Sequence, residues 1–165
     1  MEDYEINSAT LAIIPVDEET SMVYEEEESY VVKKSSNSII KDSCEYYGST
    51  YEGRCIGTKT LTGIKGKYPI IIEESRNIIF FPTTSIRNNQ SSWIALNKIK
   101  KYSKNKNMSN ILFKNDKTVK IDITYYTLEN QILRANLLSA KLLERKEELH
   151  EQSNLKNKQE IIEKS

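Results

Sequence analysis

Residues 44–59 have the sequence CEYYGSTYEGRCIGTK, and they decide how the middle of the chain is expected to fold. Glycines recur in this stretch every four or five residues, at Gly48, Gly53 and Gly57. Such spacing disfavours a regular helix or strand, because glycine loses more conformational entropy on folding and adds no packing. We therefore predict a loop, or a short turn of helix, whose backbone approaches another group closely. The interspersed tyrosines and Arg54 favour a binding surface over a reaction centre.

The residues before this stretch have the patterns of short strands. Residues 4–16 and 21–32 are each rich in apolar and β-branched residues, with partial alternation. Four consecutive glutamates at 25–28 interrupt the second run and are typical of a solvated hairpin tip or strand edge. Residues 38–41 are predicted as a third short strand that leads into the glycine-rich stretch.

Strand patterns continue after the stretch. A loop containing Gly63 and Gly66 is predicted over 61–68, and a small polar loop over 83–92. Strands are predicted at 69–73, 77–81, 93–102, 110–113 and 119–123. The first two of these are expected to pair as a hairpin, as are the last two across Asn115 and Asp116.

The periodicity changes near the C-terminus. From Leu128 onward, apolar residues recur at the three-to-four spacing of an amphipathic helix, with Thr127 as the candidate N-cap. After Leu143 the sequence is highly charged, and it either continues the helix or frays, with a break expected at 153–154. The predicted fold is therefore α+β: mostly antiparallel short strands over about residues 1–124, then the helix. We expect a single domain over 1–143 and a charged tail over 144–165.

Composition narrows the class of protein. The chain has 165 residues, 38% of them hydrophobic, which is enough for one real core. It lacks any apolar run long enough to span a membrane, and its acidic N-terminus does not resemble a secretory leader. Cys44 and Cys55 have no metal-ligand spacing and are predicted to be reduced and structural. A cytoplasmic protein without membrane contact is therefore expected.

The charges are segregated although the formal net charge is +0. Residues 1–30 carry ten Asp and Glu and no Lys or Arg, whereas residues 31–121 carry 17 Lys and Arg against six Asp and Glu. A basic middle region can attract a polyanion even when the whole chain is neutral. The alternative is that the acidic arm neutralises the basic surface at close range.

The sequence contains no complete motif for catalysis, metal binding or nucleotide binding. The spacing of Gly48 and Gly53 resembles a phosphate-binding loop, but Arg54 and Cys55 follow where lysine and a hydroxyl residue are required. His150 is the single histidine and lies in the charged tail, which excludes a histidine-based triad or zinc cluster. We therefore predict a protein that is not an enzyme, with no cofactor and no metal.

The order of residues C-x-[YF]-[YF]-G-S-x-Y-x-G-R-x-x-G-T at 44–58 resembles the signature of the ComK family of bacterial competence transcription factors. Further matches follow in the same order at Phe81-Pro82-Thr83, Ser85, Arg87, Trp93-Ile94, Glu129-Asn130-Gln131 and Arg134, and others precede it at residues 4–7 and 9–10. The resemblance implies a transcriptional activator of competence genes that recognises paired A/T-rich boxes in double-stranded DNA, largely through the minor groove. It also implies a homodimer or higher homo-oligomer associated with the nucleoid, and a proteolytic adaptor as a further candidate partner.

The candidate DNA-binding residues lie in the glycine-rich stretch and in the polar loops. They are Arg54, Thr58, Lys59, Lys65, Lys67, Ser85, Arg87 and Asn88. Arg, Lys and Asn in loops suit the narrow, electronegative minor groove of A·T-rich DNA. Tyr46, Tyr47 and Trp93 are instead predicted as packing residues.

A second hypothesis is a protein–protein regulatory module, in which the acidic arm and the amphipathic helix bind partners. Steep salt dependence of binding to A·T-rich DNA would discriminate the two functions.

Overall fold

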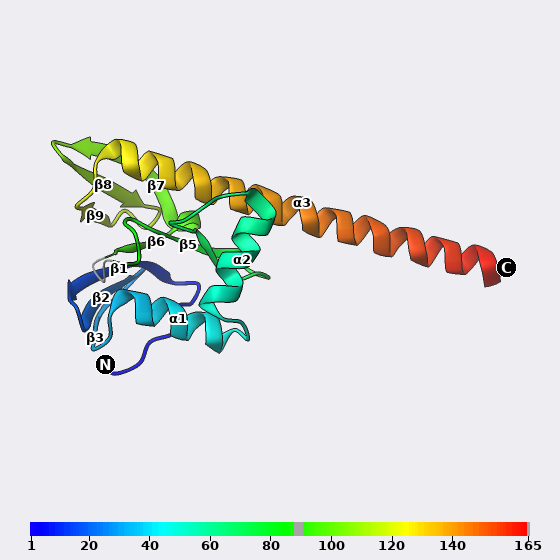
Figure 1. Cartoon of the computed structure of the whole chain (residues 1–165), viewed down its shortest axis with the longest axis horizontal. Coiled ribbons are helices and arrows are strands. Elements are labelled where there is room, and N and C mark those ends of the chain that lie inside the picture. The colour runs from blue at the N-terminus through cyan, green and yellow to red at the C-terminus, as the bar shows by residue number, and fades with distance from the viewer. Residues whose placement is uncertain (88–90, 165) are drawn as a thin grey trace.

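The computed structural model describes residues 1–87 and 91–164 and has three layers (Figure 1). A six-stranded sheet forms the middle layer, with the order β3-β2-β1-β6-β5-β4 and every neighbouring pair antiparallel. Its strands are β1 (Thr10–Asp17), β2 (Thr20–Glu25), β3 (Ser29–Val32), β4 (Ile70–Glu73), β5 (Ile78–Pro82) and β6 (Trp93–Ala95). The predicted α+β class is confirmed, and so are the hairpin at β4–β5 and the glutamate tip between β2 and β3. Residues 1–9, which include the start of the predicted first strand, lie outside any strand.

A second, three-stranded sheet contains β7 (Ile99–Asn105), β8 (Met108–Phe113) and β9 (Thr118–Ile121), and we call it the lysine sheet. The chain reaches it through the short 3-10 helix η1 (Leu96–Lys98). The single strand predicted over 93–102 is therefore wrong. Ala95 pairs with Phe80 in the first sheet, whereas Ile99 pairs with Phe113 in the second, so the chain must turn between them.

Two helices, α1 (Ser36–Tyr46) and α2 (Tyr51–Thr62), cover one face of the six-stranded sheet. The strand predicted over 38–41 is wrong, because these residues belong to α1. The Ser35 side chain caps this helix by accepting a hydrogen bond from the Ser38 amide at 3.2 Å. Ile39, Ile40 and Cys44 then fall on one buried helical face. Burial raises the pKa of the Cys44 thiol to about 12, which fits a structural cysteine.

The glycine-rich stretch is helical apart from its turn, so the predicted loop is wrong for most of its length. Gly48 adopts a φ of 84° at the turn after α1, a conformation that favours glycine. The Thr50 side chain accepts a hydrogen bond from the Gly53 amide at 2.9 Å and starts α2. Apart from its chain neighbours and the backbone of its own helix, no atom of the described residues lies within 4 Å of a Cβ placed on Gly57, so the expected close approach to another group does not occur there.

The core on the helical side contains Trp93, Phe80 and Ile13, all essentially without exposed surface. The indole Nε1 of Trp93 donates a hydrogen bond to Asn37 Oδ1 at 3.0 Å, and Tyr51 meets the indole edge-on. Trp93 is therefore a packing residue, as predicted. Tyr47 is half-buried and donates to the Ile6 carbonyl at 2.8 Å, whereas Tyr46 is 66% exposed, contrary to its predicted packing role.

The core on the opposite face joins both sheets to the long helix α3 (Tyr125–Lys164). Thr124 caps this helix, since the Thr127 amide donates to its side chain at 3.2 Å; the proposed cap at Thr127 was three residues late. The positions that α3 buries in this core are Leu128, Ile132, Ala135, Leu138 and Leu142.

Beyond the domain, α3 projects as a single exposed helix (Figure 1). The break predicted at 153–154 is wrong, because the surrounding Glu, Lys, Gln and Leu residues favour helix strongly enough to continue it. Throughout the described residues, every helix, α3 included, is too short or too polar to cross a membrane.

Candidate nucleic-acid interface

The predicted DNA-binding residues divide between the two ends of the β4–β5 hairpin. Because Ile70 pairs with Phe80, the loops before β4 and after β5 lie at the same end of this hairpin. The first loop carries Lys65 and Lys67, and the second carries Ser85 and Arg87; all four residues are exposed. Asn88, also predicted to contact DNA, lies outside the described residues.

Arg54 lies at the other end of the hairpin, on α2. Its Nη1 forms an ion pair of 3.0 Å with Oε1 of Glu74 in the β4–β5 turn, and its side chain is only 18% exposed. Thr58 is fully buried, and its hydroxyl donates to the Pro69 carbonyl at 2.7 Å. These two side chains hold α2 against the hairpin, whereas Lys59 on the same helix is exposed.

The loop that carries Lys65 and Lys67 is fixed by two residues of α3. Gln131, which is 1% exposed, donates from Nε2 to the carbonyls of Pro82 at 2.8 Å and Lys67 at 3.2 Å. Arg134 donates to the Gly66 carbonyl at 2.8 Å and to Gln131 Oε1 at 2.8 Å. Gln131 and Arg134 of the sequence motif thus position this loop.

The loop over 83–92 is tied to the start of α1. Ser36 donates from its hydroxyl to the Ser91 carbonyl at 2.6 Å, and Asn37 donates from Nδ2 to the Ile86 carbonyl at 3.1 Å. These bonds place Ser85 and Arg87 at the surface.

A groove separates this loop from the lysine sheet. One wall consists of Thr83, Thr84 and Ser92, and the other includes Met108, Lys120 and Asp122. Its volume is ≈ 490 Å³, and Ile14 and Pro15 of β1 complete its lining. The groove therefore brings the predicted loop close to Lys120, a basic residue that the sequence prediction did not include.

Lys120 is one of many lysines in the lysine sheet, η1 and the turns between them. Residues 98–120 contain eight lysines and a single acidic residue, Asp116. The register pairs Lys101 with Leu112 and Asn110 with Lys120, on the face opposite the buried Ile111. Within the described residues, Lys101, Lys106 and Lys120 form no ion pair. The high density of lysines was visible in the sequence. That their strands form one small separate sheet was not.

The acidic β2–β3 tip covers one end of the lysine sheet. Glu26 forms an ion pair with Lys98, and its carbonyl accepts a hydrogen bond from Asn115 at 2.7 Å. Lys117 donates from Nζ to the Glu25 carbonyl at 2.8 Å. The acidic tip thus covers the β8–β9 end of the lysine sheet, where Glu26 pairs with Lys98; among the described residues it makes no ion pair at the end that faces the groove.

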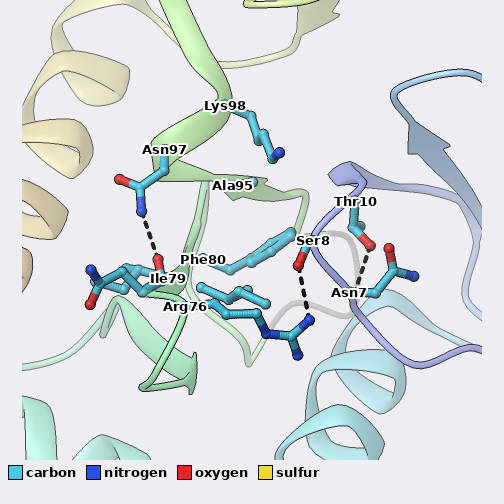
Figure 2. A pocket seen from close by; sticks show the side chains of 11 residues that line it. Asn7, Ser8, Thr10, Arg76, Ile79, Phe80, Ala95, Asn97 and Lys98 are labelled. Carbon is cyan, nitrogen blue, oxygen red and sulfur yellow. Dashed lines mark hydrogen bonds between the residues drawn. The ribbon is translucent and has the colours of Figure 1, made fainter.

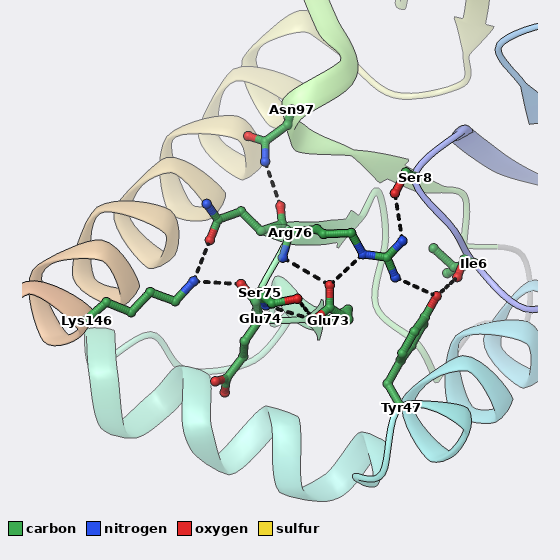
Figure 3. Close-up of polar contacts among 10 residues, drawn as sticks. Ile6, Ser8, Tyr47, Glu73, Glu74, Ser75, Arg76, Asn97 and Lys146 are labelled. Atoms are coloured by element: carbon green, nitrogen blue, oxygen red, sulfur yellow. Dashed lines mark hydrogen bonds and ion pairs between the residues drawn. The ribbon is translucent and has the colours of Figure 1, made fainter. Parts of the chain in front are cut away.

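The β4–β5 turn is a polar junction of several elements (Figure 3). Arg76 donates to Glu73 at 2.9 Å, to Ser8 at 2.9 Å and to the Tyr47 hydroxyl at 3.3 Å. Hydrogen bonds from Ser75 and then Arg76 lower the pKa of Glu73 to about 2. Lys146 of α3 donates to the Glu74 carbonyl at 2.7 Å. This junction joins the N-terminal arm, α1 and α3 to the hairpin.

A small pocket of ≈ 140 Å³ adjoins the junction, between the starts of β1 and β5 where β6 ends (Figure 2). Its two cationic residues already have partners, since Arg76 donates to Ser8 and Lys98 pairs with Glu26. The pocket consequently offers no uncommitted charge to a ligand.

The comparison with protein families covers most of the chain. The family model described as ComK protein matches residues 1–147. This chain belongs to the ComK family. The matched region includes both sheets, α1, α2 and α3 as far as the Lys146 contact, so the ComK fold supplies both walls of the groove.

A bacterial transcription factor is also similar in sequence to this chain. The competence transcription factor of Bacillus subtilis (strain 168) is 33% identical over 149 residues, which are 88% of this chain and 78% of that protein. No solved structure matches the chain significantly.

Proposed function

We propose that this chain is a transcriptional activator of competence genes that binds A/T-rich DNA at the groove between the 83–92 loop and the lysine sheet. The regulatory role is supported by membership of the ComK family and by the name of the Bacillus subtilis relative. DNA binding is supported above all by one observation: Lys120 of the lysine sheet faces Thr83 and Thr84 across the groove, at the start of the loop that carries Ser85 and Arg87.

The two walls of the groove are suited to different parts of a DNA duplex. Lys120 in the groove wall supplies a point charge for phosphates, as does Lys101 on the same outward face of the sheet outside the groove. Such contacts give affinity without sequence information. Arg87 on the loop can enter a narrow minor groove, where A·T tracts concentrate negative potential. Lys65 and Lys67, which lie at the same hairpin end, extend the phosphate-binding surface. We further propose that two copies bind the paired boxes, one copy per box, at the nucleoid.

Binding of a duplex with two A/T boxes is expected to weaken steeply with salt. If the lysines and Arg87 meet about six phosphates, the slope of log affinity against log salt is about −5, at roughly −0.9 per neutralised phosphate. Fluorescence anisotropy at several salt concentrations measures this slope, with a duplex of equal length and G·C-rich boxes as the control. A flat slope, together with equal affinity for both duplexes, would contradict DNA binding and favour the protein–protein regulatory module.

Two arginines test where the DNA lies. Arg87→Ala is expected to weaken binding to the A/T-box duplex by about 1–3 kcal/mol, because a side chain in the groove is lost. Arg54→Ala is the matched control: Arg54 is bound to Glu74 at the opposite end of the hairpin, so DNA affinity should stay within about twofold. An equal loss of DNA affinity in the two variants would indicate that the DNA does not bind at the groove.

A further inference from the structure

We infer that the outward face of the first half of α3 is a self-association surface, and that it packs antiparallel against the same face of a second copy. This inference rests on the proposed function, which requires two copies on paired boxes. It adds where the copies meet.

The surface is a stripe of exposed apolar residues. Tyr126 is 80% exposed, Leu133 60% and Leu137 41%, although all three lie on the part of α3 that packs on the domain. At about 100° per residue, they fall within about 40° of one another and nearly opposite the buried Leu128, Ala135 and Leu142. One face of the helix therefore completes the core, and the opposite face presents an uncovered apolar stripe to solvent.

An antiparallel pairing centred on Ala135 makes this stripe complementary to itself. Residues equally far before and after Ala135 then come to the same level on the two helices. Leu133 meets Leu137 of the second copy, and Glu129 comes level with Lys141 of the second copy. Each two-fold contact occurs twice, as an isologous interface requires.

The charged residues beyond the stripe also favour the antiparallel orientation of the second copy. In the first projecting turns of the helix, Glu144, Glu147, Glu148 and Glu151 form an acidic segment on the same side as the stripe, at about 100° per residue, whereas Arg145 and Lys146 between them lie off that side. The β7–β8 hairpin, with Lys104 and Lys106, extends past the start of α3, where Tyr102 and Tyr125 are in ring contact at 5.5 Å (Figure 1). Antiparallel packing lays the acidic segment of each copy beside the basic hairpin of the other. Parallel packing would instead put the two acidic segments side by side, with like charges opposed.

Replacing Leu133 and Leu137 together with glutamate is expected to weaken self-association at least about 100-fold, because both central apolar contacts are lost. Sedimentation velocity over a range of concentrations measures this, with circular dichroism to check the fold. The control makes the same replacement at Leu155 and Ile162. These residues lie on the same side of the helix but beyond the segment that pairs, so the dimer should be unchanged. A parent chain that is monomeric at all concentrations, or a dimer that persists in the Leu133/Leu137 variant, would overturn the inference.

Cross-linking tests the direction of pairing. Tyr126 and Glu144 are equally far from Ala135, so a disulfide should form only when Tyr126→Cys and Glu144→Cys chains are mixed. Cross-links within either single variant would indicate parallel packing and overturn the antiparallel arrangement. The oxidised parent chain controls for Cys44 and Cys55. DNA binding of the parent chain is measured separately, on a duplex with one box. If the parent chain does not bind this duplex, the proposed function is contradicted. The cross-links report the interface between copies alone.

Discussion

Replacing Leu138 and Leu142 by glutamate is expected to unfold the chain. Both side chains lie in the core between the two sheets and α3, with 0% and 5% of their surface exposed. Each substitution removes a buried leucine and forces a carboxylate into the same apolar site. Losses of about 3–4 kcal/mol or more at each position together reach the roughly 5–15 kcal/mol that a domain has in total.

Thermal unfolding followed by circular dichroism measures this effect. The Leu133/Leu137 double variant is the matched control, because it makes the same change on the same helix at exposed positions and should stay folded. A cooperative melt of the Leu138/Leu142 variant near the parent temperature would contradict their place in the core.

Gln131→Ala is expected to destabilise the domain by about 2–3 kcal/mol, because it leaves the buried Pro82 carbonyl without its side-chain donor. It also removes the Lys67 contact and the acceptor that orients Arg134. For a chain of this size, the melting temperature should fall by about 5–10 °C.

Limited trypsin digestion gives a local measurement of the same change. Lys65 and Lys67 lie in the loop that Gln131 and Arg134 hold, so cleavage there should accelerate in the variant. Gln159→Ala, in the exposed projecting helix, is the control and should alter neither the melting temperature nor the cleavage rate. Unchanged cleavage at Lys65 and Lys67 in Gln131→Ala would show that the loop is held by other contacts.

The parts of the fold that were predicted correctly depend on short-range patterns. The hairpins β4–β5 and β8–β9 are specified by β-branched runs around polar turns, and the glutamates at 25–28 by their need for solvent. The helices α1 and α2 were missed because the glycines outweighed the caps at Ser35 and Thr50 in the prediction. The spacing of Ile39, Ile40 and Cys44 was the signal that could have indicated α1.

The candidate site was predicted in part. The loop predicted at 61–68 is confirmed from residue 63, since α2 includes 61–62, and the loop predicted at 83–92 is confirmed for its described residues, 83–87 and 91–92. No local pattern shows that Arg54 turns toward Glu74 or that Thr58 is buried. The groove depends on η1, which carries the chain from one sheet to the other, and such a crossing is decided by tertiary packing. Sequence patterns therefore predicted the kinds of residue in the site, but not which residues from other elements lie next to them.

The hydrogen bond from Trp93 to Asn37 has a practical spectroscopic consequence. Trp93 is the single tryptophan of the chain, and it is fully enclosed beneath α1 and α2. Its fluorescence therefore reports whether the helical layer of α1 and α2 is packed on the sheet. The emission of the native protein should be blue-shifted, and it should move to longer wavelength when α1 detaches. Because the chain continues directly from Ser92 in the groove wall to this indole, ligand titrations can follow its emission without any attached dye.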